Sequence, residues 1–144
     1  MQWLITILAV IGGVGIGLQA GINGELGKRI GTIEGAFVSF AVGTLFLFLT
    51  MLFVGKGNIL SMFTVPKWQL TGGLLGAVYI FIAVLAVPKI GVATTLLAVV
   101  TGQIVTSALL DHFGMISGQQ IPLDGKRITA LLLLAAALFL FYKR

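Results

Sequence analysis

Five long apolar runs constrain this chain more than any other feature of its sequence. They cover residues 3–22, 36–54, 70–87, 92–110 and 128–142. A helix needs roughly 20 mostly apolar residues to cross a bilayer, where it satisfies its own backbone hydrogen bonds. The pattern therefore predicts an all-α integral membrane protein, with five transmembrane helices in a single transmembrane domain over residues 1–144.

Charged residues make up only 9% of the chain, whereas a soluble domain usually carries about 25%. So few charges cannot cover a water-facing surface, which excludes a soluble globular protein. The net charge of +5 comes from lysines and arginines that stand in ones and twos between the apolar runs. Charges in that pattern flank membrane spans and do not form a face for nucleic acid.

The sequence has few residues of the types that take part in catalysis or metal binding. The sequence has no cysteine and one histidine, which argues against thiol chemistry, thiolate metal sites and a histidine-built metal site. It has no nucleophile–base set and no phosphate-binding loop followed by Lys-Ser or Lys-Thr. The chain is therefore predicted to be no enzyme, with no catalytic residue, no metal and no cofactor.

The basic residues are divided almost evenly between the two sides of the membrane. Five spans place on one side Lys56, Lys67, Lys126 and Arg127, and on the other Lys28, Arg29, Lys89, Lys143 and Arg144. Orientation follows the Lys/Arg bias, and four against five is nearly no bias. We expect insertion in both orientations, so that two opposite copies form an antiparallel dimer of ten helices. The alternatives are that this weak bias still fixes one orientation, or that one of the five spans is misplaced.

Small residues and amides share the first predicted helix. Gly13, Gly17 and Gly21 repeat every four residues on one face, a spacing that lets another helix approach closely. A second face carries Gln19 and Asn23, which are one helical turn apart and lie beside further glycines. Open space beside two amides predicts a polar cavity in which both bind substrate. The alternative is that the two amides only bond neighbouring helices.

A second polar row lies on the fourth predicted helix. Gln103, Ser107 and Asp111 are spaced i, i+4 and i+8, which places them on one face. Polar side chains inside a membrane are expensive and usually face the protein interior or a water-filled path. We therefore expect Gln103 and Ser107 to bind substrate. Asp111 and His112 adjoin the end of the span, where they form a proton-sensitive pair or simply cap and anchor the helix.

The third predicted helix carries Gly72, Gly76 and Tyr79 on one face. The glycines are expected to permit close helix packing. Tyr79 sits near the centre of the span, where its hydroxyl needs a partner. It either lines the same cavity as Gln19 and Gln103 or ties two helices together. Neutral amides suit a neutral, zwitterionic or weakly charged small organic molecule better than a hard ion.

Several short motifs follow one another along nearly the whole chain. They are QAGINGEL at residues 19–26, VSFAVGT at 38–44, PKIG at 88–91, GQ at 102–103 and DHFG at 111–114. In order and spacing they make the chain similar to the YdcZ-like family of small bacterial inner-membrane proteins, within the drug/metabolite transporter superfamily. Each motif is weak by itself, and together they are fairly specific.

The resemblance implies a five-helix unit of the bacterial inner membrane, and we expect the two copies of the dimer to transport by alternating access. Related transporters fuse two such units of inverted topology, and the small multidrug resistance proteins form antiparallel dimers of four-helix chains. The latter use a glutamate in their first helix that this chain lacks in residues 3–22, which argues against their proton/cation exchange.

Together, the residues and the resemblance predict a transporter of small organic molecules. Its partners would be the lipid bilayer, a second copy of opposite orientation and the substrate. The alternatives are a non-transporting accessory or assembly subunit, or one subunit of a heterodimeric transporter. A channel is a weaker reading, because no ring of charges or repeated filter sequence occurs.

Overall fold

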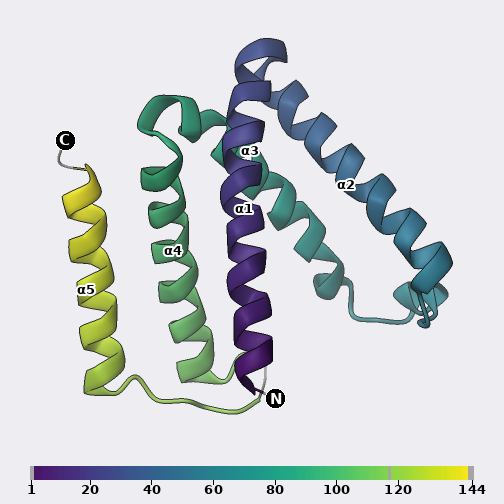
Figure 1. Ribbon diagram of the computed structural model, residues 1–144. Coiled ribbons are helices and arrows are strands. Elements are labelled where there is room, and N and C mark those ends of the chain that lie inside the picture. The colour runs from purple at the N-terminus through teal and green to yellow at the C-terminus, as the bar shows by residue number, and fades with distance from the viewer. Residues whose placement is uncertain (1, 117, 143–144) are drawn as a thin grey trace. The chain divides into compact units, whose positions relative to one another are not determined.

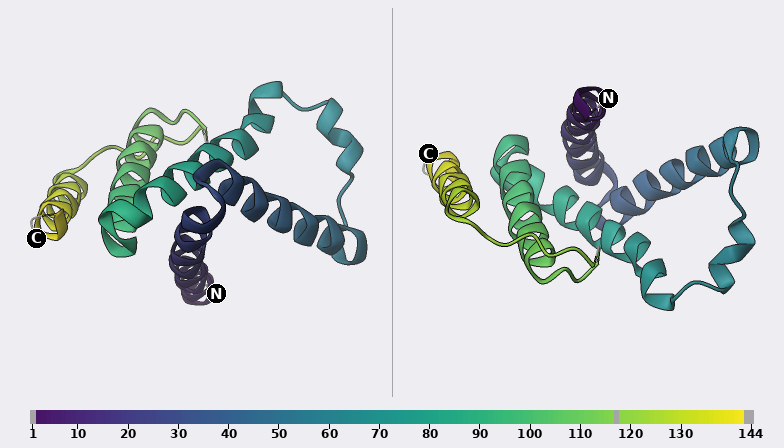
Figure 2. Two further views of the ribbon diagram at one scale, coloured as in Figure 1. Left: turned by 90° about the horizontal axis from the view of Figure 1, so that it is seen from above. Right: turned by 90° about the horizontal axis from the view of Figure 1, so that it is seen from below.

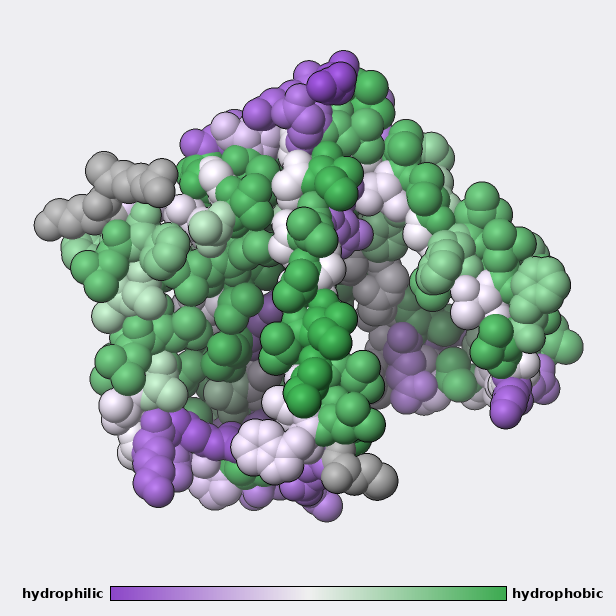
Figure 3. All heavy atoms as spheres, viewed as in Figure 1, coloured by the Kyte–Doolittle hydropathy of each residue, from purple (hydrophilic) through white to green (hydrophobic). Residues whose placement is uncertain are grey.

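The computed structural model describes residues 2–116 and 118–142, so Lys143 and Arg144 lie outside the described residues. The elements are α1 (Gln2–Ile30), α2 (Thr32–Val54), η1 (Ile59–Phe63), η2 (Lys67–Thr71), α3 (Gly72–Ile90), α4 (Val92–Phe113) and α5 (Gly125–Tyr142) (Figure 1). Within the described residues, five helical segments are long and apolar enough to cross a membrane. Hydrophobic residues cover the lengths of the helices and hydrophilic residues gather at their ends (Figure 3). The predicted all-helical architecture with five membrane-spanning helices is confirmed.

The chain divides into two compact units, Met1–Lys89 and Ile90–Arg144. The first unit contains α1, α2 and α3 with the short helices η1 and η2, and the second contains α4 and α5. The expectations of a single transmembrane domain and of an antiparallel dimer stay predictions.

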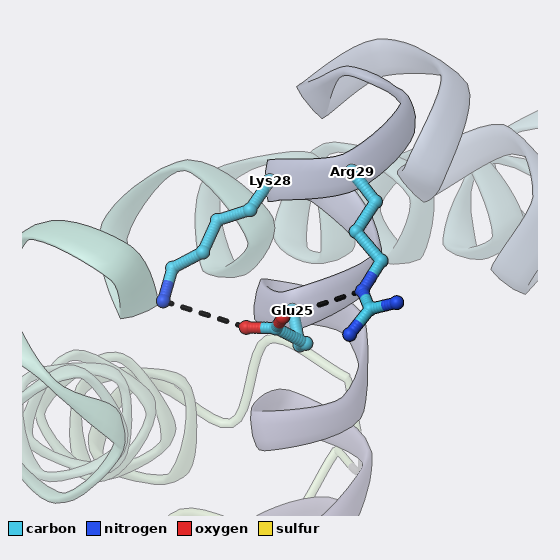
Figure 4. A network of polar contacts seen from close by, with 3 residues as sticks. All are labelled: Glu25, Lys28 and Arg29. Atoms are coloured by element: carbon cyan, nitrogen blue, oxygen red, sulfur yellow. Dashed lines mark hydrogen bonds and ion pairs between the residues drawn. The ribbon is translucent and has the colours of Figure 1, made fainter.

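Helix α1 continues to Ile30, beyond the predicted end of the first span at residue 22. Glu25 pairs with Lys28 at 3.5 Å and with Arg29 at 3.3 Å, one turn further along the same helix (Figure 4). Such i, i+3 and i, i+4 pairs support a helix, and basic residues in its last turn complement its dipole. With 29 residues, α1 is about 43 Å long and exceeds a hydrocarbon core of about 30 Å.

Two connections are shorter than the sequence suggested. Single glycines separate α1 from α2 and α3 from α4: Gly31 with φ 107° and Gly91 with φ 82°. Glycine adopts this backbone region readily because it has no Cβ. Pro88 lies inside α3 and does not end it, since the helix runs on to Ile90.

The last helix also begins earlier than its predicted start at residue 128. A carboxylate oxygen of Asp124 accepts a hydrogen bond from the backbone N–H of Arg127 at 2.8 Å. A side chain that satisfies an unpaired N–H in this way caps the first turn of a helix. Helix α5 therefore has 18 residues and a length of about 27 Å, close to the hydrocarbon thickness.

Glycines bring the helices of the first unit into close contact. A Cβ placed on Gly24 would collide with the side chain of Val87, and one placed on Gly27 with the side chain of Val84. A Cβ on Gly35 would lie 3.0 Å from the backbone of Gly27. Helix α1 therefore packs directly on both α2 and α3, and the buried residues gather at this contact: Ala20, Asn23, Gly24, Gly35, Ile80, Ala83, Val84 and Val87.

The glycines singled out from the sequence behave differently. A Cβ on Gly13 or Gly72 would meet nothing within 4 Å, and one on Gly76 would lie 3.3 Å from Cζ of Phe40. Gly17 and Gly21 are half-buried. Within the described residues of the first unit, no other helix packs closely on Gly13 or Gly72, and the packing role of these predicted glycines stays a prediction.

Candidate functional site

Two glutamines inside the spanning helices have exposed side chains. Gln19 lies in α1 and Gln103 lies in the middle of α4. Among the described residues, neither side chain makes a hydrogen bond. An amide moved from water into an apolar medium without partners costs about 2–7 kcal/mol. Each amide therefore needs a water-filled path or another protein surface in front of it.

Asn23 is the buried amide of the first unit. It is 4% exposed, and its side-chain Nδ2 has no hydrogen-bond partner among the described residues. It lies one turn before Gly27, in the stretch of α1 that packs closely on α3. Gln19, one turn earlier, is exposed. The two amides predicted to share a cavity thus differ in burial, and Asn23 presents an unused donor beside closely packed apolar side chains.

Tyr79 is half-buried on α3, one turn before the buried Ala83. Tyr79 and Asn23 belong to the first unit, whereas Gln103 and Ser107 belong to the second. That these side chains line one cavity with Gln19 stays a prediction.

An apolar groove runs between α2 and α3 of the first unit. The two helices spread apart toward the connection that carries η1 and η2 (Figure 2). The groove has a volume of about 950 Å³ and is lined by Ile33, Ala36, Phe37, Phe40, Ala41, Thr44, Leu45, Phe48, Ala77, Val78 and Phe81. Thr44 is the one polar residue among them. The groove could not be predicted from the sequence, because the residues of its walls have the same composition as a lipid-facing surface.

A smaller pocket of about 270 Å³ lies between α4 and α5 of the second unit. Its polar lining residues are Ser107, Asp111 and Arg127, and its apolar ones are Ile104, Ala108, Ala130 and Leu131. Nη1 of Arg127 lies 3.5 Å from Oδ2 of Asp111. The predicted stripe is therefore divided: Ser107 and Asp111 share this pocket, and Gln103 is not part of its lining.

The backbone beyond α4 connects the two helices that line this pocket. Gly114 ends the helix with a left-handed φ of 61°, which turns the chain back. The backbone N–H of Ile121 then donates to the carbonyl of Asp111 at 2.9 Å. The backbone N–H of Leu123 donates to Nδ1 of His112 at 3.2 Å. The connection is thus bound to the last turn of α4, immediately before α5 begins.

The contacts of Asp111 and His112 go to different partners. Asp111 pairs with Arg127 through its carboxylate, and His112 accepts from the backbone of Leu123. Both contacts join the end of α4 to later residues of the second unit, and a proton-sensitive pair of Asp111 and His112 stays a prediction. The sequence had marked Arg127 only as a charge flanking a span, since nothing in its neighbourhood along the chain links it to Asp111.

Comparison with known proteins gives a match along nearly the whole chain. The family described as "Putative inner membrane exporter, YdcZ" matches residues 4–140. The "Inner membrane protein YdcZ" of Escherichia coli (strain K12) is 26% identical over 117 residues, which cover 78% of this chain and 77% of that protein. No solved structure matches the chain. The matched region begins in α1 and ends in α5.

Proposed function

The chain belongs to the YdcZ family of inner-membrane proteins, and from that premise we propose that it transports small organic molecules across the bacterial inner membrane. Its five spanning helices make it a multi-pass membrane protein. The functional unit that we propose is an antiparallel homodimer of two oppositely inserted copies. The dimer works by alternating access, opening a shared site first to one side of the membrane and then to the other.

The observation that carries this proposal is the exposure of Gln19 and Gln103 inside spanning helices. Lipid tails cannot form hydrogen bonds with an amide, so both side chains need water or protein groups as hydrogen-bond partners. A second copy provides that environment by enclosing a polar path between the chains. Transporters built from inverted repeats place their substrate sites at such an interface near the bilayer midplane.

Five polar side chains are proposed to contact the substrate along this path: Gln19, Asn23, Tyr79, Gln103 and Ser107. Four of them are exposed or half-buried in the single chain, as expected of groups that a second copy covers. Asn23 contributes the unused Nδ2 donor. Because none of the five carries a charge, the path favours a molecule of low net charge over a hard ion.

The orientation of the chain is the first test, and the absence of native cysteine makes it direct. Gly57 lies exposed in the connection between α2 and η1, and a Cβ there would meet nothing within 4 Å. We would label a Gly57→Cys variant in intact cells with a membrane-impermeant maleimide, and again after permeabilisation. We expect about half of the protein to react from outside, since a near-even Lys/Arg count fixes no orientation.

Labelling from one side alone would overturn the homodimer. It would favour a subunit of a heterodimeric transporter, or an accessory protein, with an oppositely inserted partner chain. A second variant, Gly57→Cys with Lys56→Gln, serves as the control. It changes the count of basic residues from four against five to three against five, and should shift the labelled fraction away from one half.

The role of Gln103 is tested by Gln103→Leu, with Gln69→Leu in η2 as the matched control. A substrate contact predicts that the dimer persists, measured by the mass of the purified complex, while transport is lost. Loss of the dimer itself would show that Gln103 bonds helices together. If neither property changes, the assignment of Gln103 is wrong.

A further inference from the structure

We propose that the pocket between α4 and α5 binds a small zwitterion, with Arg127 receiving its acid group and Asp111 its ammonium group. The proposal names a substrate class for the transporter and, in that respect, rests on the proposed function. The binding itself rests on the pocket, whose lining residues all lie in one unit.

The charges of the pocket are balanced. Its lining contains one carboxylate and one guanidinium, and the remaining polar group is the neutral hydroxyl of Ser107. A ligand with one net charge would neutralise one partner of the pair and leave the other without a counter-charge. A zwitterion neutralises both at once, so the pair selects a ligand with two opposite charges and no net charge.

The ion pair leaves bonding capacity for such a ligand. The 3.5 Å between Nη1 of Arg127 and Oδ2 of Asp111 exceeds the roughly 2.7–2.9 Å of a strong charge-assisted hydrogen bond. Within the part of the chain that the structure describes, this ion pair is the one polar interaction of the guanidinium group, and the hydroxyl of Ser107 makes no hydrogen bond. The two charged side chains are 39% and 45% exposed, so a ligand can reach them from solvent.

The size of the pocket limits the ligand. Its volume of about 270 Å³ lies below the range of about 300–1,000 Å³ that holds drug-sized molecules. The walls between the charges are short aliphatic side chains, Ala108 and Ala130, flanked by Ile104 and Leu131. This lining fits a short aliphatic chain that joins an ammonium to a carboxylate or sulfonate.

Hydrogen bonds fix the backbone that carries the two charged side chains. Asp111 accepts the N–H of Ile121 at its own carbonyl, and Asp124 caps the turn that carries Arg127. Rigid placement reduces the ordering cost of binding. Arg127 thus has a function beyond the flanking charge that its place in the sequence suggests.

The direct test is binding to the full-length protein in dodecyl maltoside, a non-ionic detergent. Isothermal titration would use glycine, β-alanine, 4-aminobutyrate and taurine, with propionate and propylamine as singly charged analogues of β-alanine. At least one zwitterion should bind about tenfold more tightly than either analogue. The upper limit of concentration is 100 mM, on the order of the weakest measurable affinities. The proposal would be overturned if none of the four zwitterions binds up to this limit. It would also be overturned if the singly charged analogues bind equally well.

Variants locate the binding. Arg127→Gln should weaken it by at least about tenfold, and Ser107→Ala by about three- to tenfold, because each removes a hydrogen bond to the ligand. Lys126→Gln is the matched control, since Lys126 is the neighbouring exposed cation and does not line the pocket. If Arg127→Gln fails to fold, the reversed pair Asp111→Arg with Arg127→Asp should retain zwitterion binding. Binding that survives Arg127→Gln unchanged would overturn the proposal.

A soluble molecule and a lipid headgroup can share this chemistry, since phosphatidylethanolamine also carries an ammonium and an acid group. Nanodiscs of phosphatidylglycerol alone and nanodiscs with phosphatidylethanolamine distinguish the two sources. If the phosphatidylethanolamine headgroup occupies the pocket, it competes with β-alanine. Binding of β-alanine should then be weaker in the nanodiscs with phosphatidylethanolamine, and this weakening should depend on Arg127. Equal binding in both identifies a soluble zwitterion.

Transport is measured separately, as counterflow of the binding zwitterion in proteoliposomes. Binding without counterflow would support the zwitterion site and contradict the proposed transport function. Counterflow that is unchanged in Arg127→Gln would contradict the zwitterion site and support the proposed transport function.

Discussion

The two units of this protein hold their helices together by different means. In Met1–Lys89, helix α1 touches α2 and α3 where glycines allow close approach, and Gly24 and Gly27 face Val87 and Val84. The described side-chain hydrogen bonds of this unit join residues no more than four positions apart, so they do not cross between helices. In Ile90–Arg144, an ion pair and a histidine contact join the end of α4 to α5 and the segment before it.

This difference reflects the two ways in which helices can associate when lipid surrounds them. Lipid tails are as apolar as leucine, so membrane helices associate through van der Waals contact at small residues or through polar bonds. The first unit uses small residues and the second uses polar groups at the ends of its helices. The first is therefore sensitive to added volume, and the second to lost hydrogen-bonding partners.

The largest effect should come from adding volume to the first unit. Gly35→Val would place side-chain atoms against the backbone of α1, because a Cβ there already lies 3.0 Å from the backbone of Gly27. Backbone cannot turn aside as a side chain can, so we expect a loss of about 3 kcal/mol in stability. Thermal unfolding in detergent measures it. Gly43→Val on the same helix is the control, since a Cβ at Gly43 meets nothing within 4 Å, and equal losses would contradict the packing.

Replacing the buried amide of the first unit should have the opposite sign. Asn23→Leu keeps the number and branching of the side-chain heavy atoms and removes the Nδ2 that lacks a partner. We expect a gain of about 1–3 kcal/mol in the free energy of unfolding, together with weaker transport. Unfolding and transport are measured on the same preparation. A loss of stability would show that Asn23 bonds a group in the folded protein, and unchanged transport would exclude it from the substrate path.

In the second unit, a lost hydrogen-bond acceptor should matter more than a change of volume. His112→Phe removes the nitrogen that accepts from the backbone of Leu123. We expect a loss of about 1 kcal/mol, seen as faster hydrogen exchange at the Leu123 amide. His112→Asn, which keeps an acceptor near the same place, should recover much of the protection. Equal exchange in all three proteins would show that this bond does not hold the connection.

The smallest effect belongs to the ion pair of the second unit. Asp111 and Arg127 are each more than one-third exposed and 3.5 Å apart, so water screens their attraction. A double-mutant cycle with Asp111→Asn and Arg127→Gln should give a coupling energy below about 1 kcal/mol. A much larger value, from chemical unfolding of the four proteins, would mean that the pair is a structural anchor and would weaken its assignment as a ligand site.

Much of the architecture was predictable because the insertion of a segment into a membrane depends on its local amino-acid composition. The five apolar runs gave the number and type of the spanning helices, since a bilayer sets the length that each must cover. The helix ends were less predictable. Residues 24–30 lay beyond the predicted first span because they carry charges and glycines, yet Glu25 pairs with Lys28 and Arg29 along one helix.

The candidate site was predictable only in part. The stripe of Ser107 and Asp111 followed from helical spacing, and both line the same pocket. Arg127 escaped notice because sixteen positions (127 − 111) separate it from Asp111, and the return of the chain after Gly114 brings the two together. The apolar groove of the first unit also escaped, since lipid-facing and groove-facing residues have the same composition.

Local composition was enough to predict that the chain lies in a membrane, how many helices cross it and which polar residues those helices carry. These properties depend on the transfer of each segment from water to lipid, which is a sum over neighbouring residues. The tertiary structure decided that Gly24, Gly27 and Gly35 are the glycines in close contact, that Asn23 is buried while Gln19 is exposed, and that Arg127 meets Asp111. Contact and burial depend on which residues of other helices come near, and no local pattern contains that information.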